Sequence, residues 1–137
     1  MKILVLQHLR AEHPGIFRNF LKEDGYEWFS VHLDEGQIPP PLDDFDALWV
    51  MGGPMDVWEE EKHPWLCNEK ILIREAVEER GMPFLGLCLG HQLLAEALGG
   101  KCGPAEHPEI GVKKVQLTDD GLTGVIFDAL PEAFSCL

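Results

Sequence analysis

The sequence predicts an α/β fold in which a mostly parallel sheet is flanked by helices. Short apolar runs alternate with amphipathic helical patterns along the chain, which is typical of βαβ units. Two of these apolar runs end in glycine-rich turns, as the carboxyl ends of parallel strands often do at ligand-binding edges. Right-handed crossovers between such strands place helices on both faces of the sheet.

The first strand, residues 2–7, is rich in Leu, Ile and Val without polar alternation, so we expect it to be covered on both faces. Consecutive prolines make residues 36–45 a loop, because they sustain neither a helix nor a central strand. In chain order the predicted strands are residues 2–7, 26–33, 46–53, 82–88 and 109–117. The predicted helices are residues 14–25, 64–81 and 89–98, with a short helix or turn at 122–130.

The longest helical pattern, residues 64–81, ends at Gly81 and Pro83. Its predicted apolar face holds Leu66, Ile71, Ile73, Ala76 and Val77. Its predicted polar face holds Glu69, Lys70, Arg74, Glu75, Glu78 and Glu79.

Length and charge restrict the classes of partner. With 137 residues, of which 45% are hydrophobic, residues 1–137 are expected to form a single domain with an ordinary core. The formal net charge of −13 repels nucleic acid and anionic membrane surfaces. No apolar run approaches the roughly 20 residues that span a bilayer, and no secretory signal pattern is present. We therefore expect a cytoplasmic protein that binds neither nucleic acid nor membrane.

The cysteines do not predict a disulfide or metal framework. They are widely spaced and form no CxxC or Cys/His zinc pattern: Cys67, Cys88, Cys102 and Cys136. We expect no metal and no cofactor.

One cysteine stands at a predicted strand-to-helix turn, in the stretch "GLCLGHQ" from Gly86 to Gln92. Flanking glycines allow a sharp turn that holds the Cys88 side chain clear of the backbone, as in a nucleophile elbow. The helix that begins near Leu89 directs its N-terminal N–H groups at the sulfur and favours the thiolate. The alternative is that Cys88 is a small buried hydrophobic residue.

A second glycine-rich turn, in "MGGPMD" from Met51 to Asp56, follows another predicted strand. A backbone N–H in the Gly52-Gly53-Pro54 turn and the N–H of Leu89 are suitable donors for a developing oxyanion. The alternative for this turn is a plain loop. Two glycine-rich strand ends in this order favour an active site.

These motifs, with the later "EIG", resemble the class I glutamine amidotransferase family, and within it the stand-alone members similar to the glutaminase part of GMP synthase. The resemblance implies flavodoxin-like layering and release of ammonia from glutamine. By position it makes Cys88 the nucleophile, Gly53 and Leu89 the oxyanion-hole amides, and Gln92 a residue that holds substrate glutamine. His91 belongs to the motif, but we expect its role to be structural, because adjacent helical residues face different ways.

A thiolate mechanism also needs a histidine, oriented by a carboxylate, to move protons. The family's later His-x-Glu motif has one match here, His107-Pro108-Glu109, but it is too close to Cys88 and aligns with the start of a strand. We expect no carboxylate partner for His8, His13 or His32, and we expect His63, on the acidic loop before a helix, to cap that helix or to face solvent. The chain is therefore expected to be the N-terminal portion of a domain, C-terminally incomplete, inactive alone, and with an exposed apolar sheet edge.

The sequence leaves the acceptor of ammonia open. The expected ligand is glutamine or a γ-glutamyl compound, and a synthetase partner is a candidate consumer of the ammonia. Alternative hypotheses are a non-catalytic binding module that keeps the elbow, a γ-glutamyl hydrolase, and a cysteine-elbow protein of the DJ-1/peptidase type.

Overall fold

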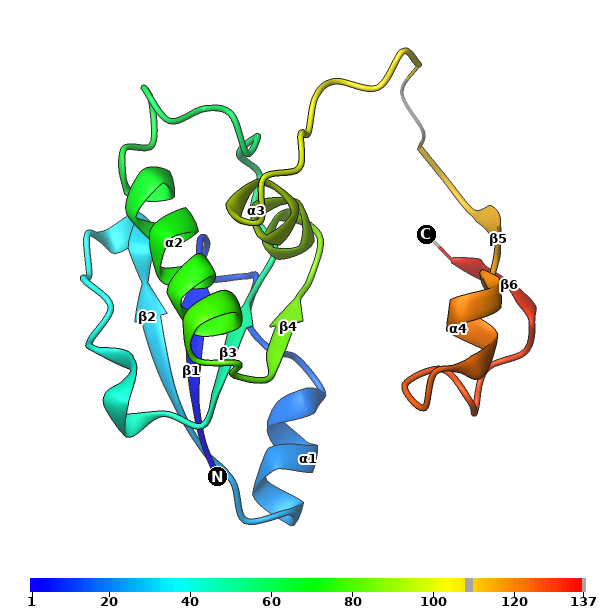
Figure 1. Ribbon diagram of the computed structural model, residues 1–137, viewed down its shortest axis with the longest axis horizontal. Coiled ribbons are helices and arrows are strands. Elements are labelled where there is room, and N and C mark those ends of the chain that lie inside the picture. The colour runs from blue at the N-terminus through cyan, green and yellow to red at the C-terminus, as the bar shows by residue number, and fades with distance from the viewer. Residues whose placement is uncertain (108–109, 137) are drawn as a thin grey trace. The chain divides into compact units, whose positions relative to one another are not determined.

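The computed structural model describes residues 1–107 and 110–136, which fall into two compact units, Met1–Gly103 and Pro104–Leu137. The first unit holds a parallel sheet with the strand order β2-β1-β3-β4 (Figure 1). The second holds an antiparallel pair of strands, β5 and β6. The α/β fold with a mostly parallel sheet is confirmed, whereas a single domain over residues 1–137 stays a prediction.

The elements of the first unit follow the predicted order. The strands are β1 (Lys2–Gln7), β2 (Glu27–His32), β3 (Ala47–Val50) and β4 (Phe84–Gly86). The helices are α1 (Phe17–Glu23), α2 (Trp65–Arg74) and α3 (Leu89–Ala97); short 3-10 turns lie at Leu33–Glu35 and Leu42–Asp44, and a π-helical segment at Glu75–Glu79 extends α2.

The core lies on both faces of β1, as its apolar sequence predicts. Leu4 and Leu6 pack on the face that α2 and α3 cover side by side (Figure 1). Ile3 and Val5 pack on the other face with Leu21 of α1. Since residues 3–6 are all fully buried, β1 is the centre of the unit rather than an edge.

Two residues of α2 lie on the opposite face from the one predicted. Glu69 is predicted on the polar face, yet it is buried at 2% exposure. Ile71 is predicted on the apolar face, yet it is 66% exposed. The buried stripe is Leu66, Glu69 and Ile73, a spacing of i, i+3, i+7 that matches one helix face. Helical geometry therefore overrides residue type at these two positions.

The second unit contains β5 (Lys113–Gln116), α4 (Asp119–Thr123) and β6 (Ala133–Cys136). The strand predicted over 109–117 is shorter than expected, and its expected start at Glu109 lies outside the described residues. The helix begins earlier than residue 122 because the Thr118 hydroxyl accepts the Gly121 N–H and caps it. No described residue of this unit is buried.

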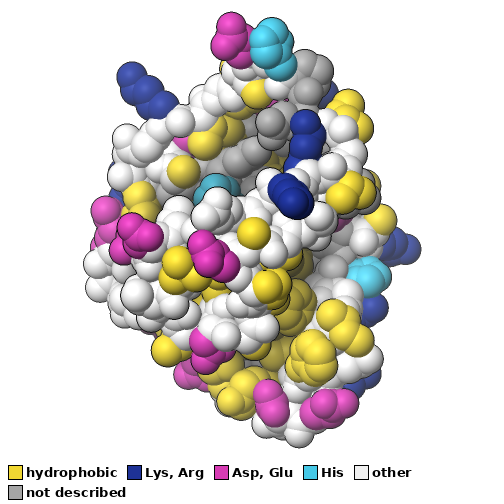
Figure 2. Space-filling model, turned by 90° about the vertical axis from the view of Figure 1, so that its right-hand side faces the viewer, with side chains coloured by type: hydrophobic (Ala, Val, Ile, Leu, Met, Phe, Trp, Pro, Cys, Tyr) yellow, Lys and Arg dark blue, Asp and Glu magenta, His cyan; other side chains and the backbone are white. Residues whose placement is uncertain are grey.

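Acidic side chains are spread over the face drawn in Figure 2 rather than gathered in one cluster, in keeping with the net charge of −13. Among the helices that the structure describes, none has the length and apolar character needed to cross a membrane.

Candidate active site

The predicted site residues meet at one edge of the parallel sheet. Gly52 and Gly53 follow β3, and Cys88 follows β4, which is the neighbour of β3. His8 follows β1, on the other side of β3. Because the strands are parallel, their carboxyl ends share one edge, and this is where open α/β sheets bind ligands.

Cys88 occupies a strained turn between β4 and α3. Its φ of 51° and ψ of −107° make it the one residue other than glycine with positive φ in the described part of the chain. Such a conformation costs about 1–3 kcal/mol and is found mainly at functional sites. The thiol is exposed at the N-terminus of α3. This is the geometry of a nucleophile elbow.

The elbow needs glycine on both sides for reasons of space. A Cβ on Gly90 would collide with the backbone carbonyl of Val50 in β3. A Cβ on Gly86 would lie 2.7 Å from the carbonyl carbon of Gly90. The first turn of α3 therefore packs directly on the strand ends, which fixes the place of Cys88 in the sheet edge.

The glycine turn after β3 packs against the elbow. A Cβ built on Gly52 would lie 3.7 Å from the Cys88 Cβ, and one on Gly53 would lie 2.9 Å from Leu89 Cδ2. Within the described residues, neither the Gly53 N–H nor the Leu89 N–H donates to an acceptor. Two free backbone donors are thus available beside the thiol.

Gln92 lies one helical turn after Cys88 and is exposed, and its N–H donates to the Cys88 carbonyl at 3.2 Å. Residues four apart share a helix face, so Gln92 is on the same side of α3 as the elbow. His91 is also exposed.

The expectation that no histidine is paired with a carboxylate is wrong for His8. Its Nε2 lies 2.9 Å from Glu69 Oε1, and its Nδ1 lies 2.9 Å from the Gly52 carbonyl oxygen. Both side chains are buried, at 0% and 1% exposure. The imidazole stacks on Trp65 with 5.5 Å between ring centroids. A buried ion pair therefore contacts the predicted oxyanion turn.

The partners of His8 determine its protonation. Burial lowers the pKa of His8, but the hydrogen bond and charge of Glu69, together with backbone acceptors that include Gly52, outweigh it and raise the pKa above the ordinary 6.5.

A raised pKa in the folded state gives a definite pH dependence of stability. The imidazolium contributes stability below pH 6.5, and this contribution is lost as the pH rises through the higher pKa of the folded protein. We expect the free energy of unfolding to fall across that range. Urea unfolding at closely spaced pH values measures it, and a His8→Leu/Glu69→Leu variant serves as the control. An equal slope in that variant would contradict the assignment.

Sequence reasoning misses this pair because its partners are 61 residues apart and both residue types are typical of exposed positions. One signal is present: Glu69 lies three residues after Leu66 and four before Ile73, within the apolar stripe of its helix. An acid in such a stripe requires a buried partner.

Of the described histidines, only His8 contacts a carboxylate. His13 accepts the Gly15 N–H, and His63 packs on the Trp65 ring. His107 is exposed, and the remainder of its motif, Pro108 and Glu109, lies outside the described residues. Among the described residues no cluster of three or more His, Cys, Asp or Glu side chains is placed to hold a metal ion.

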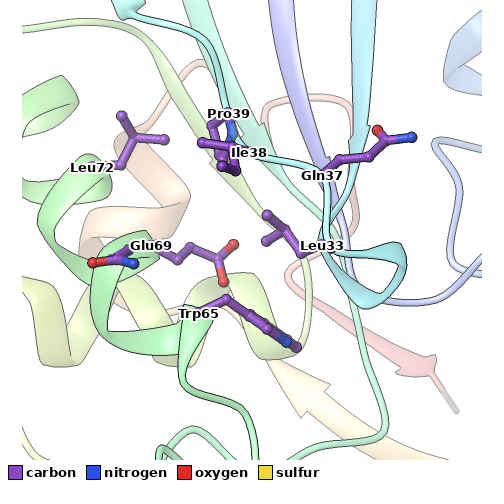
Figure 3. A pocket seen from close by; sticks show the side chains of 9 residues that line it. Leu33, Gln37, Ile38, Pro39, Trp65, Glu69 and Leu72 are labelled. Atoms are coloured by element: carbon purple, nitrogen blue, oxygen red, sulfur yellow. The ribbon is translucent and has the colours of Figure 1, made fainter.

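A cavity of about 330 Å³ lies between α2 and the segment 33–39 (Figure 3). The Glu69 carboxylate projects toward this segment between Leu72 and Trp65. Its second oxygen, Oε2, is buried and has no partner among the described residues. None of the predicted site residues lines the cavity, so we place the candidate site at the sheet edge instead.

Comparison with known proteins identifies the family of the chain. Residues 19–136 match the family described as glutamine amidotransferase class-I. The chain is 35% identical over 127 residues to the glutamine amidotransferase-like protein YfeJ of Salmonella typhimurium, covering 89% of this chain and 52% of that protein. It is 35% identical over 120 residues to a subunit of the glutamine-hydrolysing GMP synthase of Sulfolobus acidocaldarius, covering 88% and 59%.

Two solved structures have the same fold as this chain. A glutamine amidotransferase from Thermotoga maritima superposes with a TM-score of 0.82 at 30% identity, covering 98% of this chain and 58% of that one. A glutamine amidotransferase from Methylobacillus flagellatus superposes with a TM-score of 0.83 at 31% identity, covering 98% of this chain and 53% of that one. The chain thus spans between half and three fifths of the length of these relatives.

Proposed function

Since this chain belongs to the class I glutamine amidotransferase family, we propose that it carries the nucleophile and oxyanion hole of a glutaminase site. The observation that carries the proposal is the strained, exposed Cys88 at the N-terminus of α3, beside the free N–H groups of Gly53 and Leu89. The substrate is glutamine or a γ-glutamyl compound, held in part by Gln92.

The proposed reaction begins with the Cys88 thiolate, which the N-terminal end of the α3 dipole stabilises. The sulfur attacks the side-chain amide carbon of glutamine, and the carbonyl oxygen becomes an oxyanion that accepts from the Gly53 and Leu89 N–H groups. The C–N bond then breaks, and ammonia leaves with an added proton. Water hydrolyses the resulting γ-glutamyl thioester to glutamate and regenerates the thiol.

The proton transfers in this scheme need a base that the described residues do not place at Cys88. His8 is the one described histidine paired with a carboxylate, and both of its ring nitrogens are engaged in the core. We therefore propose that the chain alone turns over glutamine slowly, and that the family's His–Glu pair must complete the site. The GMP synthase relatives support a synthetase as the consumer of ammonia.

Binding of glutamine at Cys88 can be tested without turnover. L-Glutamine is expected to slow alkylation of Cys88 by iodoacetamide, because the bound side-chain amide covers the thiol. The rate at each cysteine is read by mass spectrometry, with Cys67, Cys102 and Cys136 as internal controls and Cys88→Ala as the blank. Equal protection by D-glutamine, or protection of all four thiols alike, would overturn the proposal in favour of a non-catalytic module.

A further inference from the structure

We propose that the buried His8–Glu69 pair is a positioning device for the oxyanion hole, which holds the Gly52 carbonyl in the core so that the Gly53 N–H faces the reacting carbonyl at Cys88. The proposal rests on the proposed function, since it assigns the Gly53 N–H as an oxyanion donor. It gives a role to a buried pair that the chemistry at Cys88 does not otherwise use.

The geometry of one peptide unit links the pair to the oxyanion hole. The carbonyl of Gly52 and the N–H of Gly53 belong to the same planar peptide, and the chain has no cis peptide bond among its described residues. In a trans peptide these two groups point in opposite directions. A hydrogen bond from His8 Nδ1 that pulls the Gly52 oxygen into the core therefore turns the Gly53 N–H outward, toward the sheet edge.

The donors and acceptors around the imidazole fix its protonation. The Gly52 oxygen only accepts, so His8 Nδ1 must carry a proton for this 2.9 Å contact to be a hydrogen bond. A neutral imidazole has one N–H, and the ionised Glu69 carboxylate beside Nε2 only accepts as well. Both hydrogen bonds, to the Gly52 oxygen and to Glu69, form together only when the His8–Glu69 pair carries one extra proton. The reference for this count is a neutral histidine, with its single ring proton, beside an ionised carboxylate. Glu69 thus keeps Nδ1 a donor.

Stability alone gives little reason for this pair. A buried ion pair seldom outperforms apolar residues of similar volume. Here Glu69 Oε2 is also left without a partner among the described residues, which adds a desolvation cost. Buried polar groups that cost stability are most often found at functional sites.

The surroundings make the device rigid. Trp65 stacks on the imidazole, and Glu69 is anchored in the buried face of α2. The turn itself is packed closely, since a Cβ on Gly53 would lie 2.9 Å from His8 Cβ. Two further titratable groups lie beside Gly52, the Cys88 thiol and the Glu12 carboxylate, and His63 packs on the Trp65 ring.

The test compares two double variants that differ in one hydrogen-bond donor. His8→Leu/Glu69→Leu removes the donor to Gly52, whereas His8→Asn/Glu69→Leu keeps one, because the Asn Nδ2 takes the place of His Nδ1. Both variants replace the buried charges, so neither leaves an unpaired ion. Lys70→Gln is the matched control, since Lys70 is the neighbour of Glu69 and pairs with Glu60 and Glu96 away from the turn.

The readout is the ratio of two rates of labelling at Cys88. A chloroketone analogue of glutamine forms the S–C bond with loss of chloride while its carbonyl oxygen gains charge and uses the oxyanion donors. Iodoacetamide forms the S–C bond with loss of iodide in a direct displacement that does not need them. Dividing the first rate by the second cancels changes in thiol exposure and ionisation.

We expect the ratio to fall by about tenfold or more with Leu at position 8, because one oxyanion donor is worth about 100-fold in catalysis. With Asn at position 8, or with Lys70→Gln, the ratio should stay within about threefold of the unmodified chain. Equal ratios for the Leu and Asn variants would overturn the proposal and leave the pair a purely structural role.

A measurement on the unmodified chain tests whether His8 anchors the Gly52 carbonyl even if the variants fail to fold. Nitrogen NMR of the His8 ring at neutral pH should show a protonated Nδ1; an unprotonated Nδ1 would overturn the anchoring of Gly52. If the chloroketone does not label Cys88 while iodoacetamide does, the proposed function fails instead, and Nδ1 still decides whether His8 anchors the turn.

Discussion

Gly90→Ala is expected to destabilise the fold by about 2–3 kcal/mol, which corresponds to a melting temperature lower by about 10 °C. On propensity alone, alanine would stabilise this helical position by up to about 1 kcal/mol. The added Cβ, however, would collide with the Val50 carbonyl oxygen, which belongs to β3 and cannot swing away as a side chain could. The first turn of α3 must therefore move off the sheet.

Gly103→Ala is the matched control for this prediction. A Cβ at Gly103 meets nothing within 4 Å and needs no unusual φ, so its effect should stay within about 0.5 kcal/mol. Thermal unfolding followed by circular dichroism compares the two variants. Equal melting temperatures would show that α3 does not lie against β3 as described.

Gly53→Ala is expected to lower the rate of Cys88 labelling by the glutamine chloroketone about 100-fold, the value of one oxyanion donor. The new Cβ would lie 2.9 Å from both His8 Cβ and Leu89 Cδ2, and it would push the turn away from the elbow. Iodoacetamide should label Cys88 at nearly its original rate, because direct displacement needs no oxyanion donor.

Gly52→Ala serves as the control beside it. Its Cβ would meet the Glu12 carboxylate at 3.0 Å, and that exposed side chain can rotate away. Its distance of 3.7 Å from the Cys88 Cβ is an ordinary contact. We expect Gly52→Ala to change the rate of Cys88 labelling by the chloroketone by less than about threefold. If the chloroketone labelling rate fell strongly with Gly52→Ala and did not fall with Gly53→Ala, the Gly53 N–H would not be a donor to the oxyanion.

Much of the fold could be predicted because its signals are local. The unbroken apolar run of β1 indicates a strand buried on both faces, and residues 3–6 are buried. The position of the elbow could be predicted for the same reason. Gly86, Cys88 and Gly90 lie within five residues, so this short stretch alone indicates a sharp turn.

The rest depends on contacts between distant segments. His8 and Glu69 meet across 61 residues, and both residue types are typical of exposed positions, so the place of Glu69 in the apolar stripe of α2 is the one local sign of the pair. The prediction for Ile71 is also wrong, because it follows the apolar residue type rather than the position of the residue on the helix. Ile71 lies on the exposed face of α2. The error at the short helix Asp119–Thr123 is a local one, since the capping Thr118 decides where the helix starts more than the apolar pattern after it does.

The central claim is that Cys88 is a nucleophile directed at glutamine. The most direct test is the chloroketone-to-iodoacetamide rate ratio measured at all four cysteines of the unmodified chain by mass spectrometry. We predict a ratio at Cys88 at least about 100-fold above those at Cys67, Cys102 and Cys136, because the proposed oxyanion donors, the N–H groups of Gly53 and Leu89, belong to the turns that meet at Cys88. Similar ratios at all four thiols would contradict it.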